Sequence, residues 1–209
     1  MKISYSIGKQ NKIHISCDDE YRFTVDSEFW FSSPYCMKHN IEDEQELAEF
    51  FLSVGSRFAF LAGLRLLSYS DHSKKEMISK LVQKGHKKEY VIPAIDRLEE
   101  LGYVDDERYA ENLARKLSEH KGMSARGIKN EIIMKGISRE IAENICESLD
   151  FDPVLRIIEL LNTKYSRFLA DEKGRKKAVA SLQRLGYGWS DINSAFRSIE
   201  LETEDFDDV

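Results

Sequence analysis

Apolar residues recur with the spacing of a helix face through most of this chain, and the pattern itself repeats. Three segments align without gaps: 73–98, 124–149 and 174–199. Gly85, Gly136 and Gly186 occupy the same position in them, 51 and 50 residues apart. Apolar side chains follow one helical face before each glycine and a second face after it. Because a glycine just past a helix end takes a positive φ at little cost, the pattern predicts two helices joined at each glycine.

The predicted core faces are built from equivalent residues in the three segments. Before the glycine they hold Met77, Ile78, Leu81 and Val82, then Ile128, Ile132 and Ile133, then Ala178, Val179 and Leu182. After the glycine they hold Val91, Ile95 and Leu98, then Ala142, Cys146 and Leu149, then Ile192, Phe196 and Ile199. We expect N-caps at Ser73, Ser124, Ser138, Asp152 and Ser190. Glu76 completes a capping box with Ser73, and Pro93 requires its helix to start near Glu89.

A further helix is predicted before each pair, over 57–69, 106–119 and 153–168. A unit of this size is too small to be very stable alone, so neighbouring units should pack together and share a core. We therefore predict a mostly α fold of three tandem three-helix repeats that form an elongated, curved solenoid. The expected repeats are 56–105, 106–151 and 152–201.

The two ends of the chain differ from the repeats. Residues 2–7, 12–17 and 21–25 alternate apolar and polar side chains and predict short strands. Residues 41–52 predict a helix that leads into the first repeat, so residues 1–55 are expected to form a small β element with a linking helix. The acidic segment 202–209 is expected to be a disordered tail.

No stretch of the sequence is expected to cross a membrane, and no metal site is indicated. The best apolar run, 58–64, is seven residues between two arginines, whereas a span needs about 20. The beginning of the chain lacks the apolar core of an export signal. Cys17, Cys36 and Cys146 form no CxxC pair, so neither a zinc site nor a disulfide framework is indicated. We expect a cytoplasmic protein with buried thiols and no membrane contact.

Motifs that would indicate catalysis are missing from the sequence. It contains no GxxxxGK[ST] or GxGxxG loop, no HExxH pair and no GxSxG. The five histidines are scattered, and the acidic pair Asp105-Asp106 fits a helix start, where the helix dipole favours anions. We therefore expect a binding protein without a cofactor or a metal, and not an enzyme.

Charge is distributed unevenly along the chain, whose net charge is −6. Residues 1–72 carry −4, residues 73–185 carry +4 with 23 basic and 19 acidic residues, and residues 186–209 carry −6. Basic residues recur in the helix before each glycine: Lys74, Lys75, Lys80, Arg126, Lys129, Lys173, Arg175, Lys176 and Lys177. If the repeats stack in line, these residues form a discontinuous stripe that could meet phosphates or an acidic protein groove. The alternative is a set of merely solvated helix faces.

Aromatic residues near the last glycine also allow two interpretations. Tyr187, Trp189 and Phe196 could stack on nucleic-acid bases. Phe196 falls on a core position of the alignment and is expected to pack there. For Tyr187 and Trp189, which follow the glycine in a turn, both possibilities stay open.

A run of residues between the first two repeats carries a family resemblance. It reads LGYxDDxRYA, from Leu101 to Ala110. Further matching residues are Leu66-Leu67, His72-Ser73, Glu76, Leu81, Lys84-Gly85, Leu98, Gly122, Arg126, Glu131, Lys135-Gly136-Ile137, Leu185-Gly186-Tyr187 and Ile192. Over about residues 56–200 the chain resembles the RecX family, bacterial regulators of the recombinase RecA. The resemblance implies a protein, expected to be a monomer, that lies in the groove of the RecA filament on single-stranded DNA.

The resemblance also implies an activity, which we expect to be inhibition of RecA strand exchange, ATPase and coprotease functions in DNA recombination, DNA repair and the SOS response. Two departures bear on the partner: Tyr69-Ser70-Asp71 stands where the family often has arginines, and this chain is acidic overall. The second hypothesis is a helical module that binds DNA directly through its basic stripe. A third is a generic helical-repeat scaffold, although the repeat is longer than the 34 residues of a tetratricopeptide unit.

Overall fold

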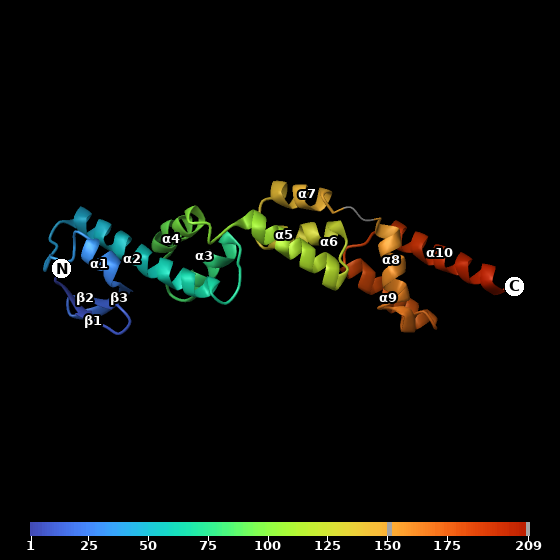
Figure 1. The fold of residues 1–209 in the computed structure, drawn as a ribbon, viewed down its shortest axis with the longest axis horizontal. Coiled ribbons are helices and arrows are strands. Elements are labelled where there is room, and N and C mark those ends of the chain that lie inside the picture. The colour runs from blue at the N-terminus through green and yellow to red at the C-terminus, as the bar shows by residue number, and fades with distance from the viewer. Residues whose placement is uncertain (150–151, 208–209) are drawn as a thin grey trace. The chain divides into compact units, whose positions relative to one another are not determined.

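The computed structural model describes residues 1–149 and 152–207, which form two compact units, Met1–Asp106 and Glu107–Val209 (Figure 1). The first unit contains β1 (Ile3–Ile7), β2 (Lys12–Cys17), β3 (Glu20–Asp26), α1 (Ser27–Ser32), α2 (Glu44–Leu67), α3 (Lys74–Gln83) and α4 (Lys88–Glu100). The second contains α5 (Asp106–Lys116, whose first residue ends the first unit), the π-helical turn η1 (Leu117–Lys121), α6 (Ala125–Met134), α7 (Arg139–Glu147), α8 (Pro153–Asn162), the short 3-10 turn η2 (Ser166–Phe168), α9 (Glu172–Arg184) and α10 (Trp189–Asp207). The predicted class, mostly helical with an N-terminal β element, is confirmed; the curved solenoid shape stays a prediction.

The three strands form an antiparallel sheet in the order β1-β2-β3, as the alternation predicted. Both connecting turns use left-handed residues, with φ of 59° and 56° at Gln10 and Asn11 and of 49° and 65° at Asp18 and Asp19. Such conformations favour Asn and Asp and match the right-handed twist of a hairpin. Helix α1 was not predicted; it follows β3 directly and buries Trp30.

Helix α2 belongs to both the β element and the first repeat. It runs unbroken for 24 residues through the predicted boundary between residues 55 and 56. Its first half buries Phe50 and Val54 against the sheet, and its second half buries Ala59 among the residues of α3 and α4. Gly55 lets α4 approach closely, since a Cβ there would lie 2.6 Å from Cδ2 of Tyr90. One helix therefore contributes to two cores.

The length of α2 corrects the membrane argument made from the sequence. Counting the apolar run between two arginines missed that the helix continues on both sides, and α2 is long and apolar enough to span a bilayer by length and composition alone. A core helix of a globular protein passes the same test. Within the first unit, α2 buries Phe50, Val54 and Ala59, and its Arg57 pairs with Asp26 at 2.6 Å.

The glycine register is confirmed in all three repeats. Gly85, Gly136 and Gly186 have φ of 91°, 87° and 93°. The residue after the glycine closes the helix end in repeats 1 and 3: the His86 N–H donates to the Leu81 carbonyl at 3.1 Å, and the Tyr187 N–H donates to the Leu182 carbonyl at 3.2 Å. Only a left-handed residue permits this closure, which is why glycine recurs there.

Most predicted helix starts are confirmed. Ser73 forms its capping box with Glu76, and the side chains of Ser124, Ser138 and Asp152 each accept a backbone N–H as N-caps. Helix α4 begins one residue before the expected Glu89. The prediction for Ser190 is wrong, because the Gly188 carbonyl accepts the Ile192 N–H at 3.1 Å and α10 begins at Trp189.

The core faces are confirmed with one exception, and the tail differs from its prediction. Met77, Leu81 and their counterparts in α6 and α9 are buried, whereas Val82 is 41% exposed because the narrow core stripe of α3 lies on the adjacent face. Helix α10 continues through the predicted tail as far as Asp207, in place of the expected disorder. Residues 208–209 lie outside the described residues.

Candidate partner-binding surface

Repeats 2 and 3 are joined by a close backbone contact within the second unit. A Cβ on Gly186 would lie 2.6 Å from both N and Cα of Gly127, so the two glycines face each other directly. The Ser124 N–H donates to the Leu185 carbonyl at 3.0 Å across the same junction. The turn after α9 is therefore covered by the start of α6.

Two residues considered for binding instead hold this junction together. The Arg126 guanidinium donates to the carbonyls of Gly186 (2.9 Å) and Tyr187 (3.1 Å). Tyr187 is 2% exposed, and its hydroxyl donates to the Gly122 carbonyl at 3.0 Å. Burial raises the pKa of Tyr187 to about 12. The open question about Tyr187 is thus settled as packing, and Arg126 is committed to the same contact.

Two further candidate cations are paired within the chain. Lys74 Nζ lies 2.7 Å from Glu99 and 3.0 Å from Asp96, and these hydrogen bonds raise the pKa of Lys74. Its backbone N–H also donates to Asp106 at 2.7 Å. This contact places the predicted helix-start carboxylate at the amino end of α3, where burial raises the pKa of Asp106.

Lys129 is the second paired cation, with its Nζ 2.6 Å from Glu143. Lys74 and Lys129 keep their charge, but an anion of a partner would have to compete with these carboxylates for them.

The remaining candidates are Lys75, Lys80, Lys173, Arg175, Lys176 and Lys177, and all except the half-buried Lys80 are exposed. Four of them cluster at the beginning of α9, where the Arg175 side chain donates to the Leu169 carbonyl at 3.1 Å. Lys176 pairs with Glu172 at 2.6 Å, but these side chains are 76% and 82% exposed, so the pair is weak. Arg126 contacts the Gly186 carbonyl beyond the carboxyl end of α9. Gly186 lies about 16 Å along the helix axis from Arg175, at 1.5 Å per residue. Arg126 and the basic cluster at the start of α9 thus do not merge.

A hollow between α9 and α10 joins part of this exposed cluster to an aromatic side chain. Its volume is about 350 Å³, and its lining comprises Glu172, Arg175, Lys176, Val179, Ala180, Gln183, Trp189, Asn193 and Phe196. Trp189 is 58% exposed, whereas Phe196 packs partly into the core as predicted. We call this hollow the α9–α10 groove. An exposed tryptophan beside two cations can hold an apolar group and a neighbouring anion.

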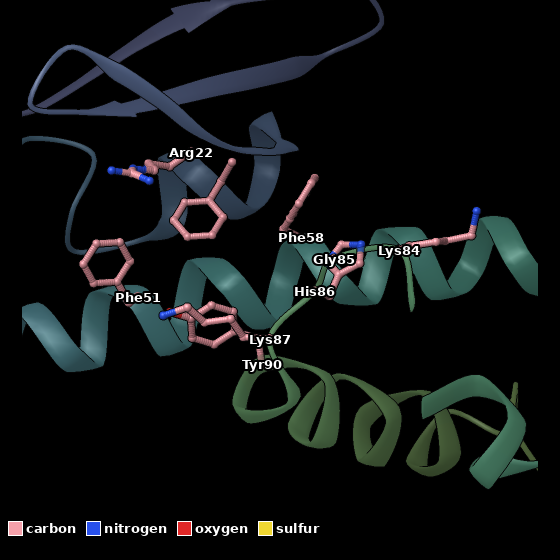
Figure 2. A pocket seen from close by; sticks show the side chains of 9 residues that line it. Arg22, Phe51, Phe58, Lys84, Gly85, His86, Lys87 and Tyr90 are labelled. Carbon is pink, nitrogen blue, oxygen red and sulfur yellow. The ribbon is translucent and has the colours of Figure 1, made fainter. Parts of the chain in front are cut away.

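A larger pocket in the first unit was not predicted from the sequence. It lies between β3, α2 and the α3–α4 turn and presents Arg22, Lys84, His86 and Lys87 beside aromatic rings (Figure 2). The basic run Lys84 to Lys88, interrupted by Gly85 and His86, was the signal that could have revealed it. The aromatic partners come from distant segments, so spacing alone could not.

Potential metal ligands and the three thiols can be located among the described residues. No group of three or more metal-binding side chains is found among them. Cys17 is buried, as predicted, whereas Cys36 and Cys146 are only partly buried. Burial raises the pKa of Cys17 and Cys146, which lowers the fraction of reactive thiolate.

Two family models and several named relatives match this chain. Residues 59–98 match the family model described as RecX, first three-helix domain, and residues 105–144 match RecX, second three-helix domain. A protein of Trichlorobacter lovleyi named Regulatory protein RecX is 30% identical over 133 residues, covering 61% of this chain and 86% of that protein. Its namesake from Bacillus velezensis is 27% identical over 213 residues, covering 98% of this chain and 78% of the relative.

Solved structures agree on the fold. A crystal structure of a regulatory protein RecX superposes with a TM-score of 0.67 at 20% identity, covering 94% of this chain and 98% of the other. RecX from Lactobacillus salivarius gives a TM-score of 0.58 at 24% identity, covering 70% and 97%. The sequence matches and the three-helix repeats lead to one conclusion: the chain belongs to the RecX family of regulatory proteins.

Proposed function

We propose that this protein binds the RecA filament on single-stranded DNA and inhibits the strand-exchange, ATPase and coprotease activities of RecA. It acts as a monomeric binding protein of the cytoplasm, without catalysis of its own. The α9–α10 groove supports this proposal most directly, because it combines the exposed Trp189 with the cations Arg175 and Lys176. Buried aromatic and arginine anchors carry much of the energy of protein interfaces.

The repeats supply a physical route to inhibition. Pre-formed helices lose little conformational entropy on binding, so their contacts translate into affinity. A surface that contacts neighbouring filament subunits binds the assembled state better than free subunits. Binding therefore shifts the equilibrium between filament and free subunits by an amount set by that difference in affinity. The proposed three-repeat division, with repeats at 56–105, 106–151 and 152–201, provides the length for such a surface.

Direct DNA binding is the alternative, and one observation favours it. Lys173, Arg175, Lys176 and Lys177 are exposed together at the start of α9 and could contact phosphates. However, Lys74, Arg126 and Lys129 are held by their own chain, which shortens the basic stripe expected from the sequence. The contacts within the chain therefore favour the filament over DNA alone.

The test measures strand exchange and ATP hydrolysis by the cognate RecA while this protein is added below the amount of filament subunits. The wild-type chain should slow both reactions and sediment with filaments. Trp189→Ala combined with Arg175→Glu and Lys176→Glu should require roughly tenfold more protein for the same inhibition, because an aromatic and Arg anchor is lost. Lys116→Glu with Lys121→Glu makes the same charge change at exposed residues of the same unit and should retain inhibition.

Two results would contradict the proposal. One is a wild-type protein that neither sediments with filaments nor alters either reaction. The other is binding to single-stranded DNA without RecA that accounts for all inhibition and weakens steeply with salt, as phosphate contacts do. Fluorescence anisotropy with a labelled oligonucleotide in the absence of RecA separates this second case.

A further inference from the structure

The pocket of the first unit has walls from four different segments. It has a volume of about 510 Å³ and is lined by Arg22, Phe23, Phe51, Phe58, Lys84, Gly85, His86, Lys87 and Tyr90. Figure 2 shows Arg22 approaching from the sheet and His86 and Lys87 from the α3–α4 turn, with the rings of Phe51 and Phe58 on α2. This volume lies within the range of pockets that bind small ligands or single anchoring side chains. We call it the aromatic pocket.

Its floor is a group of aromatic rings that hold one another in place. The centroid of the Phe23 ring lies 6.0 Å from Phe51, 6.0 Å from Phe58 and 6.3 Å from Tyr90, each pair at a steep angle. Phe23 and Tyr90 are both 8% exposed, whereas Phe51 and Phe58 are half-buried. The pocket therefore offers ring edges and a limited apolar surface of fixed shape.

The rim of the pocket is cationic. Arg22 and Lys87 pair with Glu20 (2.8 Å) and Glu89 (3.4 Å), but these pairs join exposed side chains. Exposed pairs contribute little, so an incoming carboxylate can replace them. Within the described part of the chain, Lys84 has no ion-pair partner.

The N-cap of α4 and the side chain of His86 also lie at the rim of the pocket. Lys87 occupies the N-cap of α4, where a lysine cannot accept the first-turn N–H groups, whereas α3, α6 and α9 have Ser or Asp caps. Glu89 in the first turn places one carboxylate near the positive end of the α4 dipole, while the N-cap residue itself is cationic. Burial, and then the nearby Lys84, lower the pKa of His86, whose ring packs 4.8 Å from Phe58. His86 therefore extends the apolar floor as a neutral ring near pH 7.

These features favour a short acidic peptide over a nucleic acid. Stacking of bases needs exposed ring faces and an extended basic groove. Here the rings are buried or meet edge to face, and the first unit carries 14 basic and 18 acidic residues, a net charge of −4. A polyanion would be repelled by this unit as a whole, whereas a few carboxylates can be matched by the local rim.

We propose that the aromatic pocket docks a short acidic segment of a partner protein, with one aromatic or aliphatic side chain on the phenylalanine floor and carboxylates at Arg22 and Lys87. Lys84 adds positive charge at the edge of the site. This surface is separate from the α9–α10 groove, and its occupant need not be the recombinase. The proposal therefore stands or fails independently of the function proposed above.

The experiment uses the full-length chain and a fluorescein-labelled synthetic peptide of Asp, Glu and Gly residues with one central Phe. Fluorescence anisotropy should show binding that weakens as salt is raised, because exposed charges are screened. Replacing the central Phe of the peptide by Ser, or its acidic residues by Asn and Gln, should weaken binding at least about tenfold, a loss typical of an interface anchor. Backbone amide NMR shifts of Gly85 and His86 on peptide addition would locate the site.

Matched protein variants distinguish the site from general charge attraction. Arg22→Glu with Lys87→Glu should weaken peptide binding roughly tenfold or more, since attraction becomes repulsion. Lys116→Glu with Lys121→Glu changes the net charge equally and should leave binding intact, while circular dichroism confirms that both variants are folded. Equal loss in both variants, no binding by the wild-type chain, or pocket-dependent binding of labelled oligothymidylate instead of the peptide would each overturn the proposal.

Discussion

Gly85 and Gly186 occupy the same place in repeats 1 and 3, yet their surroundings are opposite. Their φ angles are 91° and 93°. A Cβ on Gly85 would meet nothing within 4 Å, whereas one on Gly186 would overlap the Gly127 backbone. The next residue differs as well: His86 lines an open pocket, and Tyr187 is buried beneath repeat 2. One repeated turn thus lines an open pocket in repeat 1 and forms a buried joint in repeat 3.

The largest effect is expected from alanine at these two glycines. Gly186→Ala should lower the free energy of unfolding by roughly 3 kcal/mol or more, because left-handed strain adds to a backbone overlap that cannot relax. Gly85→Ala, its matched control, should cost only the left-handed strain of about 1–2 kcal/mol. Urea unfolding followed by circular dichroism measures both. Equal losses would show that the two turns are not in different environments.

The second prediction concerns the alkaline stability of the joint. The pKa of Tyr187 is raised to about 12 by burial, above an ordinary value of about 10. The neutral phenol therefore stabilises the fold fully below pH about 10, and this contribution is lost as the pH rises toward 12. Tyr187→Phe should lower the free energy of unfolding at neutral pH by about 1 kcal/mol and reduce the additional loss above pH 10. Tyr103→Phe, at a 52% exposed tyrosine of the first unit, should change neither.

The third prediction concerns the stability of the first unit at acid pH. Burial alone would raise the pKa of Asp26, but hydrogen bonds from Arg57 and the Phe29 N–H lower it below the ordinary value. Its stabilisation is therefore present above pH about 4 and is lost as the pH falls through the lowered pKa. Asp26→Asn keeps an acceptor for the Phe29 N–H but removes the charge that pairs with Arg57. It should therefore cost about 1 kcal/mol at neutral pH and flatten the acid dependence. An unchanged acid unfolding profile would argue against this role.

The smallest effect is expected at Lys74. Its pairs with Asp96 and Glu99 are partly exposed, with carboxylate side chains 49% and 47% exposed, so Lys74→Ala should lower the free energy of unfolding by less than about 1 kcal/mol. Under the proposed function it should leave inhibition of RecA unchanged, unlike the Arg175 and Lys176 variant. A Lys74→Ala protein that binds filaments much more weakly than Lys75→Ala would place α3 in the interface.

The sequence predicted what local chemistry decides. The glycine turns, the caps at Ser73 and Ser124 and the three strands each depend on a few neighbouring residues, and all are found in the structure. The misplaced cap at Ser190 was also local, but a shift of one residue at a helix start depends on the turn before it. The boundary drawn at residues 55 and 56 stays a proposal, although a continuous helix passes through it.

The candidate site could be predicted only in part, because pairing across the chain decides which charges are available. Lys74 meets Glu99 25 residues later, and Arg126 meets Gly186 60 residues later, so helical spacing could not reveal either contact. The same limit applies to Trp189 and Tyr187, two aromatic residues of one turn with opposite exposure. Which aromatic residue is covered depends on the neighbouring repeat, and the repeat pattern contains no such information.

The continuity of α2 has a consequence for shortened forms of this protein. A protease cut or gene deletion at residue 55 would divide a helix whose halves bury Phe50 against the sheet and Ala59 against the repeat. The remaining fragment would begin with an uncapped helix and a bare aromatic face, a combination that promotes aggregation. A shortened form would be tolerated only if polar residues replaced the apolar ones along that face. Loss of the N-terminal sheet therefore requires a matching change in the surface of α2 that the sheet covers.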